Sequence, residues 1–223
     1  GLTMKNLLPF AVVLFLLGTC VFIDVPGAFA KGEHYQRLAA NLLVLQGDLR
    51  QLVEHSTSVK HLQSLHGRIE EKLGVLELLV RYANQENLLI SKDSPEFFHK
   101  LKRLFVSENF FELENDLDRL SKKYPLLLSP VLHSGLTTEY FKQAEKIHQS
   151  LCSGCHSGAL SESAVPAFDL FRQSRTMSRR EFAARILTGL RGDQLTSLEN
   201  PFTDTELSAL ISYYRNSVPL EIN

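Results

Sequence analysis

The chain has few cysteines and few methionines, and it has no excess of charge of either sign. Its 223 residues include three cysteines and two methionines, and 24 basic residues stand against 25 acidic ones. The balance of charge argues against nucleic acid as a partner, because binding to a phosphate backbone needs a basic surface. No stretch shows the sustained period-2 alternation of half-buried strands, so the sequence predicts an all-α fold.

The first 30 residues have the pattern of a signal peptide. A weakly basic start at Lys5 is followed by an apolar run at 7–23 and by the small-x-small sequence AFA at 28–30. Such a segment directs export and is then removed, so we expect Lys31 to be the mature N-terminus and the protein to be periplasmic. If the leader is retained, its 17-residue run would be a short membrane anchor, which is the less favoured alternative.

Cys152 and Cys155 are the only cysteines of the mature chain, because cleavage removes Cys20. No disulfide framework beyond this pair can form. The pair belongs to the sequence Cys-Ser-Gly-Cys-His at 152–156, which is the C-x-x-C-H signature of covalent haem attachment. With the residue frequencies of this chain, the pattern occurs by chance in about one of 700 such sequences. In this motif two thiols bind the haem vinyl groups, and His156 is the proximal iron ligand.

Two other uses of this cysteine pair fit the sequence less well. A thioredoxin-like dithiol needs a βαβ setting, which the sequence lacks. A zinc site needs further cysteine or histidine ligands at metal spacing, and none stands near the pair. The sequence therefore predicts one covalently bound haem c, attached to Cys152 and Cys155 and ligated by His156.

Residues 31–128 are predicted to form a helical bundle domain. Apolar residues at alternating spacings of three and four indicate amphipathic helices, and proline and capping residues mark the ends of the later ones. We expect these helices at 33–55, at 59–83, from Ser94-Pro95 onwards, and at 109–124. The first two would form an antiparallel hairpin, because their connection is short. The bundle needs no cofactor to explain its pattern, and it offers a surface for a homodimer or for a redox partner.

Three segments follow in the C-terminal part. They are the amphipathic helix that ends in the attachment motif, EFAARILTGLRG at 181–192, and FTDTELSALISYYRN at 202–216. In this order they resemble the monohaem class I cytochrome c family, over about residues 135–219. The resemblance implies a small cytochrome domain at 129–223, which transfers single electrons between redox protein partners and is not an enzyme in itself. A subunit of a periplasmic oxidation complex is a related, less favoured role.

The resemblance also implies a contact between the first and last helices of this cytochrome domain. The last helix would cross the helix that carries the attachment motif. We expect Tyr213 or Tyr214 to pack on Tyr140 or Phe141 at that crossing.

The sixth iron ligand is the main departure from the family. The family supplies a distal methionine from the loop before the last helix, and the corresponding loop here, 193–201, contains none. Met177 is the one methionine of the mature chain, and it is a candidate iron ligand. It also has a competing structural role, because Ser178-x-x-Glu181 predicts a capping box with Met177 and Phe182 as its hydrophobic staple.

A histidine ligand and an open distal position are the two alternatives to Met177. Besides His156, the mature chain has His34, His55, His61, His66, His99, His133 and His148. A methionine ligand would raise the reduction potential, a second histidine would lower it, and an open iron would bind small ligands. The sequence thus favours an electron carrier, and it leaves a haem-based binder or sensor of NO or CO as the alternative function.

Overall fold

The computed structural model describes residues 32–54, 59–86, 93–128, 137–156, 169–189 and 202–216. The chain divides into two units, residues 1–30 and 31–223, and the described residues all belong to the second unit. Within the described ranges every regular element is a helix, which confirms the predicted all-α class. None of these helices is long and apolar enough to cross a membrane. The predicted leader and the loop at 193–201 lie outside the described residues.

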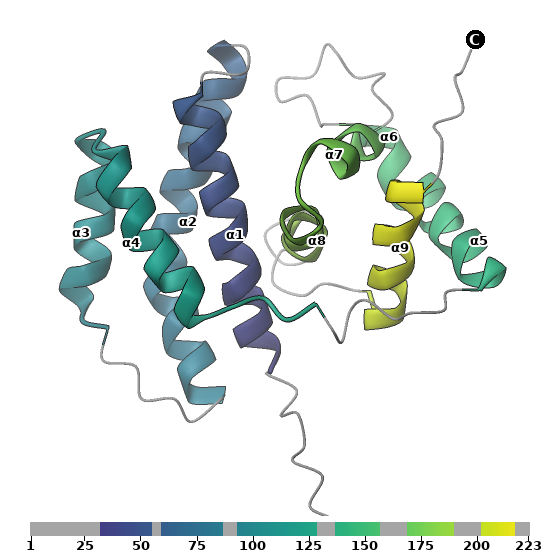
Figure 1. The fold of residues 1–223 in the computed structure, drawn as a ribbon, viewed down its shortest axis with the longest axis horizontal. Coiled ribbons are helices and arrows are strands. Elements are labelled where there is room, and N and C mark those ends of the chain that lie inside the picture. Colours follow the sequence, from purple (N-terminus) through teal and green to yellow (C-terminus); the bar gives the residue numbers. More distant parts are fainter. Residues whose placement is uncertain are drawn as a thin grey trace, which may run out of the picture. The chain divides into compact units, whose positions relative to one another are not determined.

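Four helices make up the N-terminal bundle (Figure 1). They are α1 (Glu33–Val53), α2 (Val59–Glu86), α3 (Pro95–Val106) and α4 (Phe110–Lys123). Helix α1 packs against α2 and α4, and α3 packs against the same two helices. The expected boundaries agree with the observed ones to within three residues. The spacing of apolar residues was therefore sufficient to predict this part of the fold.

On α1 the apolar residues spaced by three and four lie in the interior of the bundle. Leu38, Leu42, Leu45 and Leu49 are buried against apolar residues of the other three helices. We call this cluster the bundle core, and it is completed by Leu126, which follows Pro125 in the connecting segment. Burial of each leucine side chain contributes about 1.5–3 kcal/mol to folding. The bundle is thus held together by its own apolar residues.

The connection between α3 and α4 is a tight turn with one unusual backbone angle. Asn109 caps α4, its side-chain oxygen accepting from the Glu112 N–H at 3.4 Å. The preceding residue, Glu108, has a φ of 55°, in the left-handed region that favours glycine. The Glu108 and Asn109 N–H groups donate to the carbonyls of Phe105 and Leu104, so the turn satisfies the end of α3.

The C-terminal part consists of shorter helices. They are α5 (Thr138–Ile147), the π-helical turn η1 (His148–Cys152), α6 (Ser153–His156), α7 (Leu170–Thr176), α8 (Arg179–Thr188) and α9 (Asp204–Asn216). Helix α9 packs against α5, α7 and α8. The cluster formed there, which we call the C-terminal core, comprises Ala144, Leu170, Phe182, Ala183, Leu207, Ala209, Leu210, Ile211 and Tyr214.

Helix α8 packs on both cores. Its Ala184 belongs to the bundle core, where α8 packs against α1, whereas Phe182 and Ala183 belong to the C-terminal core. The division between a bundle domain at 31–128 and a cytochrome domain at 129–223 stays a prediction. The two cores nevertheless differ in residue type and size, and α8 is the element that joins them.

Candidate haem-attachment site

The attachment motif lies at the end of a continuous helical segment, as the sequence predicted. The segment starts as α5, widens at η1 and closes with the single turn α6. In η1 the Ser153 N–H donates to the His148 carbonyl, five residues back, instead of the usual four. Insertions of this kind in α-helices occur frequently at functional sites. Here the π-helical turn ends at Cys152, so it includes the first cysteine of the motif.

Cys152 and His156 are four residues apart on this segment, so they lie on one face. Both are half-buried, and Cys152 packs against the C-terminal core. The backbone of Cys155 lies in α6, but its side chain is not among those that the structure describes. A Cβ built on Gly154 would meet nothing within 4 Å, and the side chain of Leu151 is 62% exposed. The motif therefore has open space and apolar surface around it.

His148, one turn before Cys152, is buried against the last helix. Its Nδ1 lies 3.0 Å from the hydroxyl oxygen of Tyr214, and the two rings meet edge to face. The His148 ring also contacts Tyr213 and Phe171, so four rings form one cluster. The expected crossing of the first and last helices is present, since α5 packs on α9. The ring of His148 meets both tyrosines. Tyr140, one of the two residues that we expected at the crossing, packs against the C-terminal core, which contains Tyr214.

Burial keeps the pair His148 and Tyr214 uncharged at neutral pH. Desolvation raises the pKa of the Tyr214 hydroxyl far above its usual value, and the neighbouring Cys152 adds to this shift. Desolvation, together with the charge of His156, lowers the pKa of His148. A neutral imidazole and a protonated phenol can share one hydrogen bond without a buried charge. The contact thus fixes the helix of the motif against α9.

Further hydrogen bonds fix α9 on its other side. The Ser174 hydroxyl, which is buried, donates to the Tyr214 carbonyl at 2.8 Å. The Arg215 guanidinium donates back to the Ser174 carbonyl at 2.9 Å. Helix α7 therefore holds the backbone of α9 at the residue whose ring contacts His148.

Met177, the candidate distal ligand, lies at the C-terminal end of α7. It packs against the C-terminal core, which contains Phe182, as the predicted staple requires. Ser178 caps α8, its hydroxyl oxygen accepting from the Glu181 N–H at 3.1 Å. Met177 also lines a pocket of about 420 Å³, whose other wall is formed by the end of α1 from Arg50 to Glu54. No residue of the motif lines this pocket, and the role of Met177 as iron ligand stays a prediction.

The other candidate histidines have varied environments. His34 stacks on Tyr82, His66 contacts Phe105, and His99 is exposed on α3. His55 and His133 lie outside the described residues, as does the side chain of His61. All the described ones other than His148 belong to the bundle.

The capping box at the start of α8 is only half formed, because the Glu181 carboxylate takes part in a buried ion-pair network. Glu181 accepts from Arg185 at 2.8 Å and from Arg50 at 2.5 Å. The second carboxylate of the network, Asp48 of α1, is fully buried and accepts from Arg68 at 2.6 Å and from Arg185 at 2.8 Å. The network joins α1, α2 and α8, and sequence reasoning did not predict it.

A glycine makes the approach of α8 to α1 feasible. A Cβ on Gly47 would collide with the carboxylate of Glu181 and come within 2.8 Å of Arg185. In the sequence, Gly47 next to Asp48 is the one signal that could have indicated a close helix contact on this face of α1.

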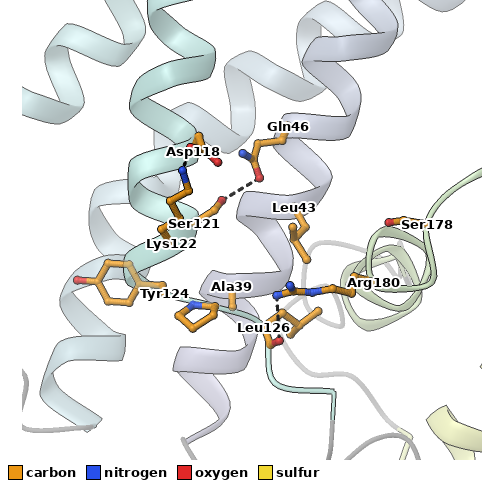
Figure 2. A pocket seen from close by; sticks show the side chains of 11 residues that line it. Ala39, Leu43, Gln46, Asp118, Ser121, Lys122, Tyr124, Leu126, Ser178 and Arg180 are labelled. Atoms are coloured by element: carbon orange, nitrogen blue, oxygen red, sulfur yellow. Dashed lines mark hydrogen bonds and ion pairs between the residues drawn. The ribbon is translucent and has the colours of Figure 1, made fainter.

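A second pocket, of about 440 Å³, lies between α1, α4 and the start of α8 (Figure 2). Its polar side chains bond to their neighbours: Ser121 donates to Gln46 at 2.8 Å, and Arg180 donates to the Leu126 carbonyl at 3.3 Å (Figure 2). No group of three or more histidine, cysteine or acidic residues that could hold a metal ion occurs in the described part of the chain. The charged residues Asp118 and Lys122 also line this pocket and pair with each other at 2.6 Å.

No family model, no curated protein and no solved structure matches the chain. The case for a function therefore depends on the residues themselves, and chiefly on the motif at 152–156.

Proposed function

We propose that this chain is an exported c-type cytochrome, which transfers single electrons through one haem bound covalently by Cys152 and Cys155. His156 is the proximal iron ligand in this proposal. The observation that carries it is the Cys-Ser-Gly-Cys-His sequence, placed at the end of a helix that is packed against α9. The haem, when bound, supplies an iron that accepts and releases one electron at a potential tuned by its ligands.

The residues around the motif fit such a group. Gly154 leaves open space beside the cysteines, and the exposed side chain of Leu151 offers apolar surface that a haem edge or a partner protein would cover. Cys152 is held against the C-terminal core, so one attachment point is fixed by packing.

The contacts of α9 support transfer of electrons in preference to catalysis. The hydrogen bond between His148 and Tyr214 holds the helix of the motif to α9, and that of Ser174 holds α9 to α7. A rigid setting keeps the geometry of a redox centre similar in its two oxidation states.

The alternative function is a haem-based binder of NO or CO, and one observation favours it. The loop at 193–201 has no methionine, while Met177 is engaged as a helix staple. If neither Met177 nor a histidine reaches the iron, its sixth position is open to small ligands.

Covalent attachment is tested on the chain produced in a host that exports proteins and loads haem c. The haem should stay with the polypeptide on a denaturing gel and show as a stained band. The double variant Cys152→Ala/Cys155→Ala should lose the band, whereas Cys20→Ala, in the leader, should keep it. A wild-type protein band that does not stain for haem would overturn the proposal.

The choice between carrier and sensor is tested by the optical spectrum of the reduced protein with and without CO. A low-spin spectrum that CO does not change supports the carrier. A spectrum that shifts on addition of CO supports the sensor. Met177→Leu keeps an apolar side chain at the staple, so loss of a thioether charge-transfer band in this variant would identify Met177 as the ligand.

A further inference from the structure

Helix α2 has a second apolar stripe, on the face that looks away from the bundle. Leu73, Leu76 and Val80 are buried in the bundle core, as in any amphipathic helix. On the outward face Val75, Leu78 and Tyr82 are 43%, 39% and 43% exposed. Their spacings of three and four residues place them on one line along the helix. The bundle core gives no reason for three large apolar residues at these positions.

Two glycines accompany this stripe. Gly67 and Gly74 lie on the same exposed face, seven residues apart. A Cβ built on either would meet nothing within 4 Å, so no contact inside the chain requires a glycine there. A glycine within a helix costs about 0.5–1 kcal/mol relative to alanine. The glycines therefore leave gaps on the outward face that a neighbouring helix can fill.

Charged residues stand on both sides of the stripe. Glu71 lies one turn before Val75 and Arg81 one turn after Leu78, and both are exposed. No ion pair within the described residues includes either of them. Their opposite charges on one face are available to an external partner.

We propose that this face, from Glu71 to Tyr82, joins two copies of the chain in an antiparallel homodimer through α2. Glu71 and Arg81 are placed symmetrically about residue 76, and so are Gly74 and Leu78. In an antiparallel pair centred there, Glu71 of each copy faces Arg81 of the other, and each Leu78 fills the gap at Gly74 of the other. A two-fold axis forms each of these contacts twice.

The parallel arrangement is disfavoured by the same residues. It would place Glu71 opposite Glu71 and Arg81 opposite Arg81, and like charges that face each other destabilise a helix pair. The stripe is also preorganised, because Tyr82 stacks on His34 of α1 with ring centroids 5.2 Å apart. A side chain that is already held in place loses little conformational entropy on association. The face thus complements a second copy of itself, and it does so only when the two α2 helices run antiparallel.

The test is the mass in solution of the haem-loaded protein, measured by sedimentation velocity over a range of concentrations. We expect a dimer for the wild type. Glu71→Arg and Arg81→Glu should each weaken dimerisation by roughly tenfold or more, because each reversal creates two repulsive pairs. The double variant Glu71→Arg/Arg81→Glu should restore the dimer, since the antiparallel pairing only exchanges the two charges. Leu78→Glu should give a monomer.

The matched control is Phe111→Glu, which changes a side chain that is 79% exposed on α4, away from the stripe. It should leave the dimer intact. A wild type that is monomeric at every concentration would overturn the proposal and leave the stripe to a different protein. A dimer that survives both Leu78→Glu and the single charge reversals, or a double variant that stays monomeric, would overturn it as well. The charge variants decide the matter even if Leu78→Glu fails to fold.

Discussion

The bundle core and the C-terminal core have different compositions, and the difference bears on what each part needs in order to be stable. Among the described residues the bundle core has 23 buried members, mostly leucines, drawn mainly from four helices. The C-terminal core has nine, and a cluster of rings around His148 and Tyr214 lies at its edge. Long amphipathic helices can bury enough apolar surface on their own, whereas short helices around a small core gain from a large apolar cofactor. We therefore infer that the proposed haem, once bound, would complete the C-terminal core.

The two cores also differ in their buried polar groups. The bundle buries the carboxylates of Asp48 and Asp116, which are paired with cationic side chains. The cluster around α9 buries neutral groups, the ring of His148 and the hydroxyls of Ser174 and Tyr214. The pairs of Asp116 join α3 and α4, whereas those of Asp48 and of the buried Glu181 lie where α8 meets α1 and connect the two parts.

The largest effect is expected from removal of the charge that links the parts. Asp48→Asn keeps the shape of the side chain but leaves Arg68 and Arg185 without their shared carboxylate. Burial of uncompensated cationic groups should lower the free energy of unfolding by roughly 3–5 kcal/mol. Urea unfolding followed by circular dichroism measures the loss. A change below about 1 kcal/mol would show that the network does not connect the two parts energetically.

A matched pair of leucine truncations compares the cores directly. Leu117→Ala in the bundle core and Leu207→Ala in the C-terminal core remove the same atoms from buried positions. Each should lower stability by about 2–5 kcal/mol. Only Leu207→Ala should also change the haem spectrum or the reduction potential, because its core carries the motif. Equal spectral changes in both variants would contradict the separation of roles.

A smaller effect is expected from the buried amine of Lys72 in the bundle. Burial outweighs the attraction of Asp48 and lowers the pKa of Lys72 to about 8. Below this pH the amine is charged in both the folded and the unfolded states. Above it the folded state releases the proton first, while the unfolded state retains it up to about pH 10.5. The unfolded state then binds more protons, so this residue makes stability rise with pH over that window.

The variant Lys72→Met should abolish this rise, which amounts to roughly 1–3 kcal/mol between about pH 7 and about pH 10. The measurement is the difference in urea midpoint between wild type and variant at the two pH values. Lys142→Met, at an exposed position of α5, is the control and should give the same pH dependence as wild type. A constant difference between wild type and Lys72→Met would show that Lys72 does not titrate in this window.

The smallest effect is expected at the turn between α3 and α4. Glu108→Gly should raise stability by about 0.5–1 kcal/mol, because glycine adopts the positive φ of this position without strain. Glu108→Ala keeps the strain and is the control, which should show no gain. Thermal melting of both variants checks the prediction, and the gain should leave the haem spectrum unchanged, since the turn belongs to the bundle. A Glu108→Gly protein that melts no higher than wild type would contradict the account of the turn.

The bundle could be predicted from the sequence because its helices are long and regular. The spacing of Leu38, Leu42, Leu45 and Leu49 identified both the helix and its buried face. The start of α3 followed from Ser94 and Pro95, and the end of α4 from Pro125, because caps and prolines act locally.

Contacts between distant segments could not be predicted in this way. Asp48 and Arg185 are polar residues that a helical pattern assigns to solvent, but the packing of α8 on α1 pairs them, with Asp48 fully buried and the Arg185 side chain 13% exposed. The burial of His148 depends in the same way on the crossing of α9, which brings Tyr214 to it. The capping motif at Ser178 predicted the start of α8 but could not indicate that Glu181 bonds to arginines of two helices.

The intact mass of the purified protein decides whether one haem is covalently bound to an exported chain. We expect a chain that begins at Lys31 and carries the added mass of one haem, and this added mass should be absent from Cys152→Ala/Cys155→Ala. A mass equal to that of the polypeptide alone, from a host that loads haem onto a control cytochrome, would contradict this expectation.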